Sequence, residues 1–212
     1  MVAWIAATGL GLVLFLVVHL GGVALAAVAP ESFERYAAHL HSRPWLPFLE
    51  AGLAALALAH PGLALSRWRA NRRAGGEPVP RRRSRREGAG AALGALAGRT
   101  LPWSGGLLLA FLVIHLVQLR WPRPAAGQEL AALHAVLERP GWLALYLLAG
   151  PALALHLFHG NESAHRSLGL LAPANGEVLR RAGRVLAVLL GGGFSLVPPL
   201  LLLRGSLPLP PA

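Results

Sequence analysis

Residues 8–20 read TGLGLVLFLVVHL, and residues 104–116 read SGGLLLAFLVIHL. A hydroxyl residue followed by glycine, then a phenylalanine and a histidine, recur at the same offsets in both segments. Both segments lie within apolar stretches, and such stretches of low complexity can match by chance. A second, independent feature is therefore needed to establish a repeat.

The spacing of the histidines is that second feature. His60 follows His19 by 41 residues, and His156 follows His115 by the same 41 residues. We therefore expect a two-helix unit that is used twice. Because the first segment of each unit crosses the membrane in the same direction, the units are expected to be related by a pseudo-twofold axis along the membrane normal.

The composition places the chain in a bilayer. Of its 212 residues, 55% are hydrophobic and 14% charged, which excludes an ordinary soluble domain. A membrane-spanning helix needs about 20 mainly apolar residues, and lipid cannot satisfy an exposed backbone. We expect one all-α domain over residues 1–212, an integral membrane five-helix bundle in which a fifth helix joins four histidine-bearing ones. The expected spans are residues 2–29, 45–66, 101–119, 141–165 and 180–203.

The charge pattern predicts the orientation. The formal net charge is +11, and all 20 basic residues are arginines that lie mostly between the spans. Residues 67–98 form an expected Arg-rich linker, whereas the first loop has only Arg35 and Arg43, offset by Glu31 and Glu34. The positive-inside rule puts the linker and the N-terminus in the cytoplasm. The positive charge is thus a topology signal, and we expect no nucleic-acid partner.

Each of the first four expected spans carries a candidate ligand histidine, and the fourth carries a second candidate in His159. Ionisable residues within a span are costly and usually functional. At about 1.5 Å rise per residue, His19 and His115 lie in the outer half of the bilayer. His60 and His156 lie in the inner half by the same argument. Depth alone therefore predicts two pairs.

A pair of neutral imidazoles that face each other across a bundle can bind a haem iron at both axial positions. The chain has no cysteine, so such a haem is non-covalent and b-type. We expect two haems b, an outer one on His19 and His115 and an inner one on His60 and His156. For a single intramembrane histidine, the alternative is an interhelical hydrogen bond.

His159 is an alternative inner ligand, because it lies three residues after His156 on the same side of the helix. It breaks the 41-residue spacing, and we prefer His156. The remaining histidines are expected to be solvated polar residues in loops or at membrane borders: His39, His41, His134 and His165.

With these residues in place, the chain resembles the cytochrome b subunit of the succinate dehydrogenase and fumarate reductase family, in its single-subunit, five-helix, di-haem form. The most specific match is HLFHG at residues 156–160, since family members carry similar His-x-x-His-Gly or His-x-x-Asn-Gly runs. Elsewhere in the family the ligand sits at the position of His159. The resemblance also rests on residues 8–20, 33–36, 104–116, 163–164 and 167–169, and on Glu50.

The resemblance implies a multi-pass subunit of the bacterial inner membrane that anchors a flavoprotein and an iron–sulfur subunit on the cytoplasmic face. Electrons would pass between the iron–sulfur subunit and menaquinone or ubiquinone in the lipid bilayer. The subunit itself is expected to be non-catalytic. The alternatives are a b-type anchor of another quinone-linked oxidoreductase, a haem-free anchor and a proton-relay membrane protein. Glu50 is expected to be an interfacial residue, with proton handling near an outer quinone site as the alternative.

Overall fold

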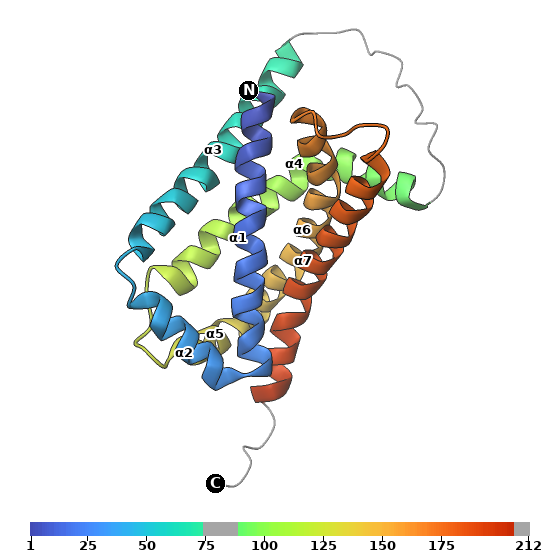
Figure 1. Ribbon diagram of the computed structural model, residues 1–212. Coiled ribbons are helices and arrows are strands. Elements are labelled where there is room, and N and C mark those ends of the chain that lie inside the picture. The colour runs from blue at the N-terminus through green and yellow to red at the C-terminus, as the bar shows by residue number, and fades with distance from the viewer. Residues whose placement is uncertain (74–88, 206–212) are drawn as a thin grey trace.

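The computed structural model describes residues 1–73 and 89–205 (Figure 1). Residues 74–88 of the expected linker, and the proline-rich tail after residue 205, lie outside the described residues. Throughout the described ranges the regular structure is helical. The elements are α1 (Val2–Val28), α2 (Pro30–His41), α3 (Leu46–Arg73), α4 (Ala89–His115), the π-helical turn η1 (Leu116–Arg120), α5 (Glu129–Leu137), α6 (Pro140–Ser167) and α7 (Gly176–Gly205).

Five of the described helices are long and apolar enough to cross a membrane: α1, α3, α4 together with η1, α6 and α7. The expected all-α bundle is confirmed, and the chain is a multi-pass membrane protein. Successive long helices run in opposite directions between two ends of the bundle (Figure 1). One end carries the N-terminus and the last turns of α3, and we call it the linker end. The other carries α2 and α5, and we call it the α2/α5 end.

Several helices extend beyond the expected spans. α3 continues to Arg73 and α4 already begins at Ala89, so the expected linker at residues 67–98 is shorter in the structure. Arginine is a good helix former, and its long side chain reaches water from a helix end, so a helix need not stop where its apolar run stops. α7 likewise runs without a break through Pro198 and Pro199.

The short helices α2 and α5 were not predicted, and they place His39, His41 and His134 on helices rather than in loops. The two helices lie together at the α2/α5 end (Figure 1). The Glu34 carboxylate of α2 accepts hydrogen bonds from the backbone N–H groups of Glu129 and Leu130, at 3.3 and 2.8 Å. Glu34 thus satisfies free N–H groups at the start of α5 and ties the two helices together.

Glu34 and Glu129 also affect each other's proton affinity. Burial and a hydrogen bond to the Glu129 carboxyl raise the pKa of Glu34. Burial acts in the same direction on Glu129, but hydrogen bonds from Glu34 and from backbone N–H groups outweigh it and lower the pKa of Glu129. His41 lies 3.4 Å from Glu129, whose side chain is only 6% exposed. A proton held on Glu34 therefore stabilises the contact between α2 and α5.

The protonation of Glu34 predicts that stability depends on pH. The raised pKa of Glu34 means that the folded state binds its proton more tightly than the unfolded state, so the free energy of unfolding falls as pH rises above the ordinary value of 4.5. Glu34→Gln keeps a neutral side chain, so we expect a higher Tm than wild type at pH 7 but not at pH 4. Thermal unfolding in detergent tests this. Glu31→Gln, at an exposed position of the same helix, is the control, and an equal gain at both pH values would contradict the prediction.

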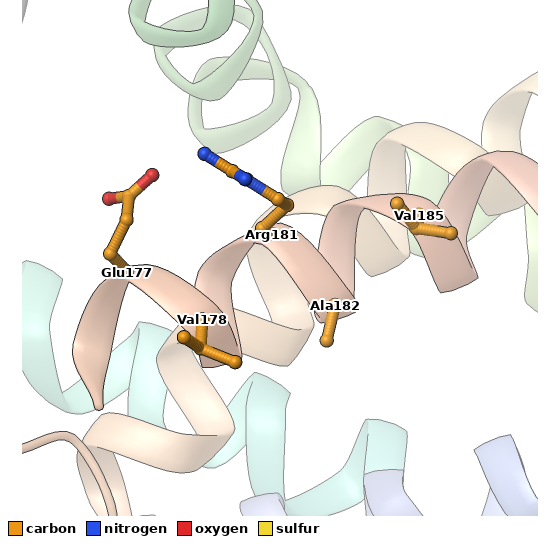
Figure 2. A pocket seen from close by; sticks show the side chains of 5 residues that line it. All are labelled: Glu177, Val178, Arg181, Ala182 and Val185. Carbon is orange, nitrogen blue, oxygen red and sulfur yellow. The ribbon is translucent and has the colours of Figure 1, made fainter.

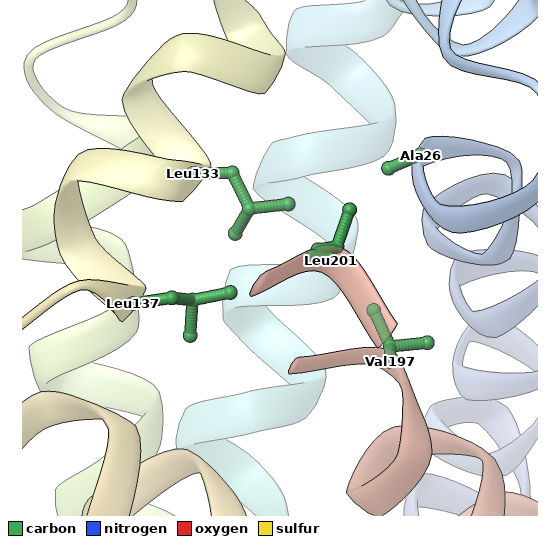
Figure 3. Packing of buried hydrophobic residues seen from close by; sticks show 5 residues of the cluster. All are labelled: Ala26, Leu133, Leu137, Val197 and Leu201. Atoms are coloured by element: carbon green, nitrogen blue, oxygen red, sulfur yellow. The ribbon is translucent and has the colours of Figure 1, made fainter. Parts of the chain in front are cut away.

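Apolar packing joins α5 to the membrane helices. Figure 3 shows one cluster in which side chains of α5, α1 and α7 meet. Its buried members are Ala26, Leu133, Leu137, Val197 and Leu201. α6 and α7 pack closely along their length because small residues face each other. A Cβ on Gly191 would lie 2.5 Å from the Ala154 Cβ and 2.7 Å from the Gly150 carbonyl oxygen, so the two backbones almost touch.

Gly191→Val is expected to separate α6 from α7 and lower the stability by about 2 kcal/mol or more, because backbone atoms cannot move aside cheaply. The measurement is the Tm of the purified protein in detergent. The matched control is Gly192→Val, since a Cβ on Gly192 meets nothing within 4 Å. Equal losses in both variants would show that valine in the helix, and not the close packing, causes the effect.

Candidate functional site

Four of the histidines on the long apolar helices meet as two pairs. His19 of α1 faces His115 of α4, with ring centroids 6.0 Å apart and an interplanar angle of 74°. His60 of α3 faces His156 of α6, with centroids 6.3 Å apart and an angle of 75°. These are the two pairs that the depth argument predicts.

Glycine contacts give the levels of the two pairs along the bundle. A Cβ on Gly9 would lie 3.0 Å from the His60 Cε1, and one on Gly105 would lie 3.3 Å from the His156 Cε1. Gly9 precedes His19 by ten residues, and Gly105 precedes His115 by ten. Ten helical residues rise about 15 Å, so this distance separates the two pairs, with His60 and His156 nearer the linker end.

The helices that carry facing histidines are held apart. Within the described residues, α3 packs closely on α1, and α4 packs on α6, whereas α1 with α4 and α3 with α6 are not among the closely packed pairs. The imidazole rings therefore reach across the space between the two units of the repeat. The two units nevertheless touch, because α1 of the first unit packs closely on α6 of the second.

The contacts around the histidines repeat as the sequence does. The Thr8 Oγ1 lies 3.3 Å from the His60 Nδ1, and the Ser104 Oγ lies 3.4 Å from the His156 Nδ1. At the other level, Phe15 stacks on His19 at 5.2 Å between centroids, and Phe111 stacks on His115 at 5.6 Å. The hydroxyl-glycine and phenylalanine positions of the repeat thus surround its histidines.

Hydrogen bonding assigns the tautomers of the pair near the linker end. The Thr8 hydroxyl donates to the Trp4 carbonyl at 2.8 Å, and the Ser104 hydroxyl donates to the Leu101 carbonyl at 3.2 Å. With the hydroxyl protons placed on these carbonyls, each hydroxyl oxygen is left to accept from the histidine Nδ1, and we assign the tautomers accordingly. The Ile5 carbonyl accepts from the His60 Nδ1 as well, at 3.2 Å. A protonated Nδ1 leaves Nε2 with its lone pair, which is the form that binds a metal.

The pair near the α2/α5 end is held differently. The Tyr146 hydroxyl lies 3.1 Å from the His115 Nδ1 and donates its proton to the Gln118 Oε1 at 3.2 Å. With that proton placed on Gln118, the Tyr146 oxygen is left to accept from the His115 Nδ1, and we assign this tautomer to His115. His19 packs between Phe15 and Phe194, whose centroids lie 5.2 and 5.8 Å from its own.

The geometry fits a haem better than a metal held by protein alone. Within the described ranges, no group of three or more His, Cys, Asp or Glu side chains could hold a metal ion. A haem iron needs only two protein ligands, because the porphyrin supplies four nitrogens. A metal–imidazole bond is about 2 Å long and the ring centre lies roughly 1 Å beyond the nitrogen, so two axial imidazoles have centres roughly 6 Å apart. Both observed separations match this value.

The other candidate residues lie elsewhere. His159 packs against Gly98, where a Cβ would lie 3.2 Å from its Nδ1, while it is His156 that faces His60. His165 bonds the Asn161 carbonyl through Nδ1 at 2.7 Å. Glu50 binds Arg120 through both carboxylate oxygens and contacts Arg123 at 3.7 Å. These ion pairs join α3 to η1 and agree with the interfacial interpretation of Glu50.

Sequence reasoning missed Tyr146 and Gln118. Tyr146 is a polar aromatic residue within an apolar span, ten residues before His156. The same position in the first unit is Glu50, ten residues before His60. The repeat register therefore gives a signal for Tyr146, through its match with Glu50, and none for Gln118.

A hollow of about 430 Å³ lies on the first turns of α7 and is separate from the histidine pairs (Figure 2). All of its lining side chains come from this one helix: Glu177, Val178, Arg181, Ala182 and Val185. Val178 is 69% exposed and Val185 is 52% exposed. The hollow is an open face of α7 without convergent polar groups.

Comparison of the chain with models of protein families, with curated proteins and with solved structures finds no match. The histidine pairs and their surroundings therefore carry the functional assignment.

Proposed function

We propose that the chain is a di-haem cytochrome b that carries electrons across the membrane. His19 and His115 would hold one haem, and His60 and His156 the other. The observation that carries this proposal is the meeting of four intramembrane histidines as two facing pairs with centroids 6.0 and 6.3 Å apart. Bound haem supplies an iron that changes oxidation state by one electron, and two axial histidines leave that iron no open position for oxygen.

The chain's own residues prepare this site in three ways. Hydroxyl and carbonyl oxygens lie within hydrogen-bond distance of Nδ1 of three histidines, which leaves Nε2 of each as the nitrogen that would bind iron. Gly9 and Gly105 allow the imidazoles of His60 and His156 to lie against a neighbouring helix. Apolar side chains of α1, α6 and α7 keep water from the interior, including Leu16, Leu153, Leu157, Leu190 and Phe194.

The resemblance stated above supports a finer proposal. The chain would be the membrane anchor of a succinate dehydrogenase or fumarate reductase complex in a bacterial inner membrane, with menaquinone or ubiquinone as the membrane partner. The arginines near the linker end favour a cytoplasmic position for that end and for the N-terminus. The His60–His156 pair would then lie on the side of the iron–sulfur and flavoprotein subunits, and the His19–His115 pair on the opposite side.

A redox experiment in native membranes tests this finer proposal. In membranes of the source organism, we expect succinate to reduce a b-type absorbance that is absent when the gene is deleted. Reduction by another donor, such as formate, with no response to succinate or fumarate, would overturn the succinate dehydrogenase assignment and leave the cytochrome in place. If gene deletion removes no b-type absorbance from membranes that contain the wild-type protein, the cytochrome proposal fails as well.

A further inference from the structure

The two histidine pairs differ in the hydrogen bonds that their Nδ1 atoms make. In the pair near the linker end, aliphatic hydroxyls of Thr8 and Ser104 face His60 and His156 at 3.3 and 3.4 Å. In the other pair a phenol, Tyr146, faces His115 at 3.1 Å. The repeat relates the two histidines within each pair, so it leaves the surroundings of the two pairs free to differ.

The tyrosine is the first member of a longer chain of hydrogen bonds. Its hydroxyl donates to the Gln118 Oε1 at 3.2 Å, while the Gln118 Nε2 is buried without a hydrogen-bond partner. Gln118 lies in the π-helical turn η1, which begins directly after His115. A π turn carries more residues than an α turn, so it changes the direction in which the following side chains point. Such turns are frequent at functional sites.

Comparison of the two repeat units shows that this series of hydrogen bonds occurs in the second unit and not in the first. The position of Tyr146 corresponds to Glu50 in the first unit, and the Glu50 carboxylate is engaged by Arg120 and Arg123. His19, which corresponds to His115, is held between the rings of Phe15 and Phe194. Both imidazoles of the pair near the α2/α5 end thus have aromatic neighbours, but among the hydrogen bonds of the described residues a phenol hydroxyl faces Nδ1 of His115 and not of His19.

We propose that Tyr146 and Gln118 are positioning residues that set the redox potential of the His19–His115 site separately from that of the His60–His156 site. This inference rests on the proposed haem ligation. A hydrogen bond from Nδ1 makes an imidazole a more basic ligand, and a more basic ligand stabilises the oxidised iron. Donation from Tyr146 to Gln118 makes the phenol oxygen a better acceptor, because successive hydrogen bonds polarise one another.

The test is a redox titration of the purified protein, in which two b-type components are followed by their absorbance. Tyr146→Phe keeps the ring and removes only the hydroxyl, so one component should move to higher potential while the other stays. We expect about a tenfold change in its reduction equilibrium, which is about 59 mV for a one-electron couple. Gln118→Leu should move the same component in the same direction by less.

Two further variants sharpen the test. The double variant Tyr146→Phe/Gln118→Leu should match Tyr146→Phe alone, because Gln118 acts only through the hydroxyl. Ser104→Ala removes an acceptor at the other level and should move the other component. If Tyr146→Phe fails to retain haem, Gln118→Leu still provides the test. Gln118 is hydrogen-bonded to Tyr146 and reaches His115 only through that hydroxyl, so its replacement leaves the contact with the histidine in place.

The outcomes separate this inference from the proposed function. Wild-type protein without haem would overturn both. Two haems in wild type, with no shift in the hydroxyl and amide variants or with equal shifts of both components, would overturn the inference alone. The expected result is that Tyr146→Phe and Gln118→Leu shift the potential of one component only, and that Ser104→Ala shifts the potential of the other component.

Discussion

His60→Ala is expected to leave about one haem b per chain where the wild type holds about two. His60 supplies one of the two imidazoles at its level, and its partner His156 alone cannot fill both axial positions. The His19–His115 pair lies about 15 Å away along the bundle and on different helices, so its haem should remain. Pyridine haemochrome assay of purified protein gives the ratio, and His19→Ala should lose the other haem.

His159→Ala is the matched control for the ligand assignment. His159 lies one turn from His156 and packs against Gly98 rather than facing His60, so its loss should leave both haems in place. Loss of one haem in His159→Ala, with both retained in His156→Ala, would contradict the pairing and would assign the inner ligand to His159.

Gly9→Val is expected to abolish haem binding at the His60–His156 level although no ligand is changed. A Cβ on Gly9 would lie 3.0 Å from the His60 Cε1 and 3.4 Å from its Nδ1, so even one added carbon requires a shift of a few tenths of an ångström. Valine adds three carbons, which also separate His60 from its acceptors Thr8 and Ile5. We expect Gly9→Val protein to hold about half of the wild-type haem and to lose the hydrogen bonds of the His60 Nδ1 to Thr8 and Ile5.

The control for Gly9→Val lies on the same helix. A Cβ on Gly21 meets nothing within 4 Å, so Gly21→Val carries the same cost of valine in a helix without the contact. Gly21→Val should therefore keep both haems. A full haem complement in folded Gly9→Val protein would show that His60 does not need the contact with α1.

The membrane helices and the histidine pairs could be predicted because they depend on features that a sequence shows directly. Apolar length defines a span, and the fixed rise of a helix gives the depth of His19, His60, His115 and His156. These four depths, together with alternating helix direction, give the pairing that the structure displays. The hydroxyl-glycine repeat also has a structural basis, since it forms the surface against which His60 and His156 pack.

The remaining features depend on packing between distant segments. α2 and α5 are short, and Glu34 satisfies the start of α5 from about 95 residues away in the sequence. The contact between Tyr146 and His115 depends on the rotation of α6 relative to α4, which periodicity does not fix. The extension of α3 to Arg73 also went unpredicted, because the arginines mark the end of the apolar run and not the end of the helix.

The most direct test of the proposed di-haem function is the haem content of the purified wild-type protein, measured by pyridine haemochrome assay together with a dithionite-reduced minus oxidised spectrum. We expect about two non-covalent haems b per chain and a spectrum of six-coordinate, bis-histidine iron. Folded, helical protein that binds no haem, even when haem is supplied during expression, would contradict the proposal.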